Sequence, residues 1–162
     1  MKKLTIILIV VIYVASVVVV GVFGLKAIPV DERYPVNAIS FVESVDEDGT
    51  EHYFKYGGVE LQKKTENGKL VYAANFSFRD APDAMPINYN INPTNASDKS
   101  VDITVISRSA DGCYELTRSI TGAYYIKLNK VEGKSGSSVT LLIKAVDGSG
   151  VSVQMRLTAW DR

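Results

Sequence analysis

An uncharged apolar run near the N-terminus constrains this chain more than any other feature. It extends from Leu4 to Leu25, LTIILIVVIYVASVVVVGVFGL, and follows Lys2 and Lys3. As a helix, its 22 residues would measure roughly 33 Å, enough to cross a hydrocarbon core of about 30 Å. Val and Ile are poor helix formers in water, but in lipid the backbone has to satisfy its own hydrogen bonds. We therefore expect residues 4–25 to form one transmembrane helix.

Two kinds of segment share this composition, an uncleaved anchor and a cleaved secretory signal peptide. A signal peptide has a shorter apolar core, usually about 7–15 residues, and ends in a small-residue cleavage site. The nearest candidate for such a site is Val22-Phe23-Gly24, which lacks the A-x-A pattern. The length of the run favours the anchor, and a cleaved, secreted protein is the alternative.

The two lysines ahead of the run set its expected orientation. Lys and Arg concentrate on the cytoplasmic side of membrane helices, so residues 1–3 are expected to be a short cytoplasmic tail. The far flank also carries basic residues, but Asp31 and Glu32 accompany them. We expect residues 26–35 to form a short stiff linker. The domain over residues 36–162 is then extracytoplasmic, and the protein a single-pass protein of the cell membrane.

Alternation of apolar and polar residues dominates the remaining sequence. Residues 151–159, VSVQMRLTA, place Val153, Met155 and Leu157 on one face. Residues 69–79, KLVYAANFSFR, show the same period, with these residues on one face: Leu70, Tyr72, Ala74, Phe76 and Phe78. A period of two is typical of a half-buried strand. Weaker alternation predicts eight more strands: Ala38–Val45, His52–Tyr56, Val59–Lys64, Met85–Ile91, Val101–Ser107, Tyr114–Ile120, Ala123–Lys130 and Ser138–Val146.

Glycine-containing turns separate these segments. Asp48-Gly49, Gly57-Gly58, Asn67-Gly68 and Asp147-Gly148 each supply a residue that accepts positive φ at little cost. Asn67-Gly68 is the strongest hairpin signal because alternating segments flank it on both sides. About nine or ten short strands at this spacing are typical of an all-β sandwich or barrel.

One stretch carries a family resemblance. Pro93–Ile103, PTNASDKSVDI, is similar to the signature of bacterial immunoglobulin-like domains of group 2, although its last residue stands where that family usually has Trp. Ile87–Ile91 matches the leading strand of the family, and Val139–Leu157 matches its closing strands. The resemblance covers roughly Met85–Ala159 and implies an immunoglobulin-like antiparallel sandwich in a surface or adhesive setting. Asn37–Asp83 matches poorly and is expected to contain an additional N-terminal β-hairpin region.

The sequence offers no convincing catalytic or metal site. His52 is the single histidine and has no partner motif, so we interpret it as a surface residue. Cys113 is the single cysteine and cannot form an internal disulfide; we expect a small buried side chain or a reactive thiol. The acidic stretch Asp46–Glu51 begins like a calcium loop, but the further oxygen ligands are missing. We therefore expect a solvated turn, no cofactor, no metal and no enzymatic activity.

Charge and aromatic residues lead to a binding hypothesis. Without the two lysines of the expected tail, 16 basic and 18 acidic residues remain, which argues against nucleic acid as a partner. Tyr53, Tyr56 and Tyr125 are candidate partner-binding residues, since exposed aromatic side chains often anchor interfaces. The leading hypothesis is a non-enzymatic, membrane-anchored surface module for binding, adhesion or envelope structure, with another surface protein or a cell-wall glycan as partner. The remaining alternative is an exported enzyme or inhibitor on a β scaffold.

Overall fold

The computed structural model describes residues 12–13, 33–66, 68–109, 112–130 and 136–160. The chain divides into two units between Arg33 and Tyr34, and in the first unit the two residues described before Arg33, Ile12 and Tyr13, are helical. The expected transmembrane helix and most of the expected linker therefore lie outside the described residues. Within the described residues there is no helix with the length and hydropathy needed to cross a membrane.

The second unit, Tyr34–Arg162, contains no helix in its described part, and the expected all-β class is confirmed. Fourteen strands follow one another along the described residues: β1 (Ala38–Ser40), β2 (Val42–Val45), β3 (Glu51–Tyr53), β4 (Lys55–Tyr56), β5 (Val59–Glu60), β6 (Gln62–Glu66), β7 (Lys69–Ser77), β8 (Ala84–Pro86), β9 (Asn90–Asn92), β10 (Val101–Arg108), β11 (Tyr114–Arg118), β12 (Tyr124–Leu128), β13 (Ser137–Ala145) and β14 (Ser152–Trp160).

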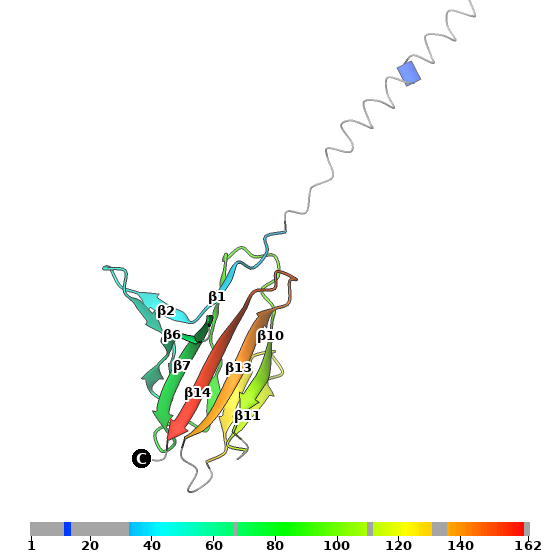
Figure 1. Cartoon of the computed structure of the whole chain (residues 1–162). Helices are drawn as coiled ribbons and strands as arrows, with labels where there is room; N and C mark the ends of the chain where they lie inside the picture. The colour runs from blue at the N-terminus through cyan, green and yellow to red at the C-terminus, as the bar shows by residue number, and fades with distance from the viewer. Residues whose placement is uncertain (1–11, 14–32, 67, 110–111, 131–135, 161–162) are drawn as a thin grey trace, which may run out of the picture. The chain divides into compact units, whose positions relative to one another are not determined.

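Five strands form the largest sheet, in the order β10–β13–β14–β7–β6 (Figure 1). Neighbours run antiparallel except β14 and β7, which pair in parallel with Met155 opposite Tyr72 and Leu157 opposite Ala74. The expectation of an entirely antiparallel sandwich is wrong at this pair. Parallel neighbours need a long crossover connection, and the chain between β7 and β14 supplies it, since it contains β8 to β13.

A second layer of strands faces the inner side of this sheet. It contains the sheet β11–β12–β8 and the pair β1–β9. Ile126 of β12 and Met85 of β8 are buried there, in the same core cluster as Met155 and Leu157 of β14. Burial of this apolar surface from both layers is the main term that stabilises the domain. The arrangement is that of a β-sandwich with one core.

The long strands follow the expected alternation in part: β14 shows it throughout, whereas β7 buries both faces from Val71 to Ala74. On β14, Val153, Met155 and Leu157 are buried, and the polar residues between them face away from the core cluster. On β7 the expected inward positions from Tyr72 onward are buried, but Leu70 is 39% exposed. The expectation for Leu70 is wrong because this residue lies beside the turn, on the part of the hairpin that extends past the core.

The three segments before β7 are bent, which the alternation did not predict. Each breaks into two short strands, at Phe41, Phe54 and Leu61 respectively. The amide of Phe54 donates to the carbonyl of Phe41 at 2.9 Å, and the amide of Leu61 donates to the carbonyl of Phe54 at 3.1 Å. The bends therefore lie side by side, and Phe41 and Leu61 are buried in the core. We call residues 38–66 the bent meander.

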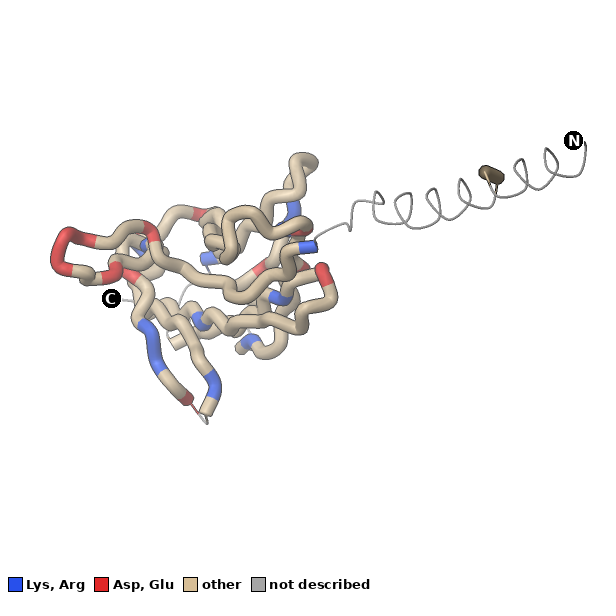
Figure 2. Tube along the Cα trace, turned by 90° about the horizontal axis from the view of Figure 1, so that it is seen from above, with Lys and Arg blue, Asp and Glu red and all other residues tan. Residues whose placement is uncertain are grey.

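Two hairpins project from the body of the domain, as Figure 2 shows. The β2–β3 hairpin carries the acidic residues of the Asp46–Glu51 stretch, and the neighbouring β6–β7 hairpin carries Lys63, Lys64 and Lys69. The β6–β7 hairpin is the one expected at Asn67-Gly68, and Glu66 pairs with Lys69 across its turn. Gly68 has φ of 74°, which explains the glycine there.

Candidate functional site

Tyr53, the first of the three candidate partner-binding residues, lies in β3 and is half-buried. Its ring packs against Tyr72 with centroids 5.6 Å apart, and its hydroxyl donates to Glu51 at 2.5 Å. The hydrogen bond to Glu51 raises the pKa of Tyr53 to about 12. The side chain is therefore occupied by contacts within the domain.

Tyr56 lies in β4 and is buried, with 1% of its surface exposed. Its hydroxyl accepts a hydrogen bond from the amide of Asn88 at 3.0 Å, and burial raises its pKa to about 12. The expectation that Tyr56 anchors a partner requires an exposed ring. The structure places the ring in the core, where it helps to fill the space beneath the bent meander.

Tyr125 lies in β12, opposite Thr117 of β11 and Pro86 of β8, and is half-buried. It points away from the core cluster, which includes its neighbour Ile126. The three tyrosines belong to three different sheets, and none lines the groove described below. The structure therefore does not bring them together into one site.

The two residues with reactive side chains that the sequence singled out, His52 and Cys113, lie at the surface and in the core respectively. His52 is exposed, with Nε2 2.8 Å from Asp46 Oδ2 and Nδ1 3.6 Å from Glu60 Oε1. Cys113 is fully buried and accepts a hydrogen bond from the hydroxyl of Ser137 at 3.5 Å. These placements agree with a surface histidine and a small buried thiol.

The acidic stretch forms the tip of the β2–β3 hairpin. The amide of Gly49 donates to the carbonyl of Asp46, and the amide of Thr50 donates to the carboxylate of Asp48, each at 3.0 Å. Hydrogen bonding with Thr50 lowers the pKa of Asp48. Across the described part of the chain, no group of three or more His, Cys, Asp or Glu side chains is placed to hold a metal ion.

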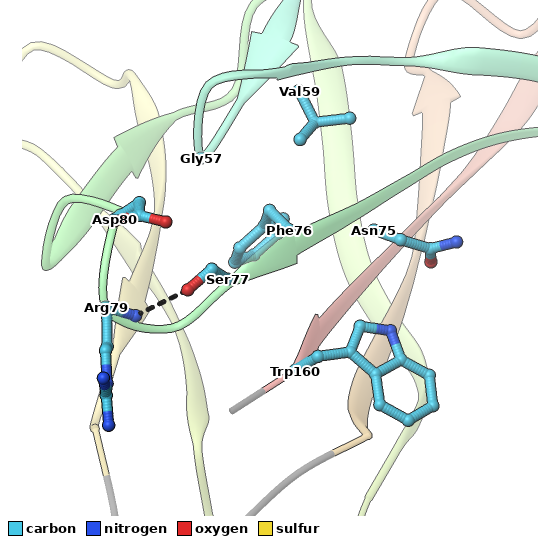
Figure 3. A pocket seen from close by; sticks show the side chains of 8 residues that line it. All are labelled: Gly57, Val59, Asn75, Phe76, Ser77, Arg79, Asp80 and Trp160. Atoms are coloured by element: carbon cyan, nitrogen blue, oxygen red, sulfur yellow. Dashed lines mark hydrogen bonds between the residues drawn. The ribbon is translucent and has the colours of Figure 1, made fainter. Parts of the chain in front are cut away.

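A groove with a volume of about 900 Å³ lies at the end of β7 and β14 (Figure 3). We call it the Trp160 groove. Its lining combines an exposed aromatic residue, the turn at Gly57 and several polar side chains. Its lining residues are Gly57, Val59, Asn75, Phe76, Ser77, Arg79, Asp80 and Trp160.

Trp160 is 47% exposed, but its backbone is hydrogen-bonded and one side of its ring is covered. Its carbonyl accepts a hydrogen bond from the amide of Phe78 at 3.0 Å, and the carbonyl of Ala159 accepts one from Gly136 at 3.0 Å. The benzo part of the indole lies against Gly136, where an added Cβ would be 3.2 Å from the ring. Since a glycine lies against it, the ring packs close to the backbone and keeps a defined position.

The opposite wall of the groove joins the bent meander to β7. Gly57 has φ of 56°, and an added Cβ would lie 2.6 Å from Cγ of Phe76. No side chain larger than hydrogen fits between this turn and the buried Phe76 ring without displacing one of them. Gly57 is therefore required both by its backbone conformation and by the close approach that shapes the groove.

Polar side chains line the groove between these walls. Asn75 is exposed on the same face of the sheet as Trp160, and Ser77 accepts a hydrogen bond from the amide of Arg79 at 3.2 Å (Figure 3). In the described residues, no ion pair engages the side chain of Arg79 or Asp80. An amide, a hydroxyl, a guanidinium and a carboxylate can together both donate and accept hydrogen bonds.

A second hollow lies on the other layer, around Tyr124. It has a volume of about 460 Å³ and is lined by Phe54, Ile87, Asn88, Tyr89, Ala123 and Tyr124. The guanidinium of Arg118 lies 5.0 Å from the centroid of the Tyr124 ring, so one face of that ring is already in contact with a cation. The Trp160 groove has the more accessible ring.

The sequence expectations did not include this groove. Trp160 continues the alternation of β14 past Ala159, and its even position places it on the outer face with Gln154 and Arg156. The same rule that assigned Leu157 to the core therefore indicated an exposed tryptophan. The approach of Gly57 to Phe76 has no comparable signal, since it depends on how the meander bends.

Comparison with models of known protein families finds no match to this chain. A search of curated proteins finds no similar sequence. The functional argument therefore rests on the residues and their geometry.

Proposed function

We propose that this chain is a non-enzymatic binding module held at the outer face of a membrane by residues 4–25. The Trp160 groove is its binding surface. The uncharged apolar run and the lysines before it support the anchor and its orientation. On this proposal the β-domain is an immunoglobulin-like sandwich, a reading that its two layers and its resemblance over Met85–Ala159 support.

The observation that carries the binding proposal is the exposure of Trp160 together with its position in the groove. Tryptophan is enriched at binding interfaces, where its large ring buries apolar surface and its N–H finds a hydrogen-bond partner. Here the residue is about half-exposed, its indole lies against Gly136, and it lines a groove together with polar side chains. Rings held in this way bind partners without a further loss of side-chain freedom.

Photo-crosslinking in native membranes tests whether the groove is occupied. A photoreactive amino acid replaces Arg79, at the rim of the groove, or Lys127, which is exposed on β12 and serves as the control position. The proposal predicts a discrete adduct from position 79 and none from position 127. Equal labelling from both positions, or none from either, contradicts a binding surface at the groove.

Fractionation tests the anchor separately. The intact protein should stay with membranes through high-salt and carbonate washing, because burial of the apolar run does not depend on ions. Recovery in the soluble fraction with a new N-terminus near Leu25 would instead establish the cleaved, secreted alternative. Sequencing the N-terminus of the mature protein therefore separates the two.

A further inference from the structure

We infer that the Trp160 groove binds a neutral saccharide, with a sugar ring stacked on the indole of Trp160. This inference rests on the proposed binding function and names its ligand class. The faces of sugar rings present C–H groups with a slight positive charge, and the face of an aromatic ring is negative. A half-exposed indole that is fixed in place is therefore a suitable platform for a sugar ring.

The polar residues of the groove complement sugar hydroxyls. Each hydroxyl both donates and accepts hydrogen bonds, so its partners need both capacities. The Asn75 amide offers both, the Asp80 carboxylate accepts and the Arg79 guanidinium donates, all on the lining of one groove. An apolar peptide side chain would leave these groups without partners, which is costly.

The charges of the groove favour a neutral ligand. Arg79 and Asp80 contribute one positive and one negative charge, and no other ionisable side chain lines the groove in the described part of the chain. An anionic ligand would meet the carboxylate and a cationic ligand the guanidinium. Nucleic acid would require several basic residues along one surface, and this lining has one.

The shape of the groove also favours a short ligand over an extended one. Its volume of about 900 Å³ is near the upper end of the range of roughly 300–1,000 Å³ that is typical of small-molecule sites. The pairing of β6 with β7 reaches only Ala73, so the edge of β7 beyond it could accept a peptide strand. The turn at Gly57, however, lies against Phe76 in the middle of that segment. A peptide remains the competing ligand, and the experiments have to distinguish it from a saccharide.

The chain has one tryptophan, so tryptophan emission, excited selectively over that of the nine tyrosines, reports on the groove alone. The full chain is prepared in a detergent without a sugar headgroup and titrated with chitotetraose and with cellotetraose. At least one should shift the emission saturably, with a dissociation constant on the order of 1 mM or tighter. No saturable change with either probe overturns the inference.

Variants establish that the response comes from the groove. Asn75→Ala should weaken binding by about tenfold, a factor that corresponds to the loss of one well-made hydrogen bond. Trp160→Ala, followed by calorimetry, should abolish binding, and Lys127→Ala should leave it unchanged. Thermal melts verify that each variant is folded. Binding that persists in folded Trp160→Ala contradicts the inference.

The crosslinking experiment separates this inference from the proposed function. Glycan-cleaving enzymes should degrade the ligand that is crosslinked to position 79, and proteases should leave that ligand intact. Adducts that contain only a second polypeptide would show that the groove binds a protein, which refutes the saccharide and leaves the binding function standing. Absence of adducts refutes both.

Discussion

The five-stranded sheet and the bent meander are built from strands with the same alternation, but the two regions use it differently. In β14, alternate residues from Val153 to Ala159 are buried without interruption because the strand lies on the core throughout. In residues 38–66, burial is confined to the bends at Phe41 and Leu61 and to Ile39 and Tyr56, while β2 and β6 are largely exposed. Alternation therefore reports burial only where a strand remains on one layer.

The Trp160 groove lies where these two regions meet. Trp160 is the last residue of β14 in the sheet, and Gly57 belongs to the meander. The sheet supplies the ring of Trp160, and the bent meander supplies the opposite wall of the groove. The difference between the regions thus accounts for the presence of a hollow at this end of the domain.

The largest effect is expected in the sheet, from Leu157→Ala. Leu157 is fully buried, and truncation of a core leucine typically costs about 2–5 kcal/mol through lost burial and the remaining cavity. The matched control is Gln154→Ala on the outer face of the same strand, which should cost within about 0.5 kcal/mol. Denaturant melts measure both. Equal losses would show that alternation does not report burial in this strand.

A smaller effect is expected at the junction, from Gly57→Ala. The substitution adds a methyl group within 2.6 Å of Phe76 at a position with positive φ, and overpacking of this kind costs about 1–3 kcal/mol in addition to the backbone strain. Gly58→Ala is the control, since Gly58 also has positive φ but no atom within 4 Å of the added carbon. If the two variants lose the same stability, the contact with Phe76 does not shape this wall.

The smallest effect is expected in the projecting hairpin, from the titration of His52. Its hydrogen bond to Asp46 and the charges of Asp46 and Glu60 raise its pKa above 6.5. Because the folded-state pKa is the higher one, protonation stabilises the fold below about pH 6.5, and this contribution is lost as the pH rises through the raised pKa. Carboxylates with a lowered pKa, such as Asp48, titrate below this window.

His52→Gln provides the comparison for this titration. The denaturation midpoint of the parent should fall relative to that of the variant as the pH rises through the window. Since both His52 and Asp46 are exposed, the change should be small and should shrink with added salt. A midpoint difference that does not vary with pH would show that the ion pair contributes nothing to the hairpin.

The fold class and the core of the long strands could be predicted from the sequence. Val153, Met155 and Leu157 were assigned correctly because each strand residue points to one of two faces, and β14 stays on the core. The parallel pairing of β7 with β14 could not be predicted, since strand order depends on long-range contacts. The bends at Phe41 and Leu61 were missed for the same reason, because bulky apolar residues also suit a straight strand.

The candidate site could be predicted only in part. The outward direction of Trp160 follows from the same alternation, whereas its proximity to Arg79 and Gly57 depends on the crossover and on the meander. Tyr56 was predicted as a partner-binding residue from its aromatic side chain alone, and the structure shows why that prediction is wrong. Tyr56 combines a large apolar ring with a hydroxyl that finds a partner at Asn88, so it satisfies the core as well as a surface.

The most direct test of the account is a chemical-shift map of the full chain, in the same sugar-free detergent, titrated with the saccharide that changes its fluorescence. The account predicts that the indole N–H of Trp160 and the side-chain amide of Asn75 shift together along one binding curve. Signals from the hollow around Tyr124 and from the β2–β3 hairpin should stay in place. Shifts that concentrate around Tyr124, with the Trp160 indole unmoved, would contradict the groove as the binding surface.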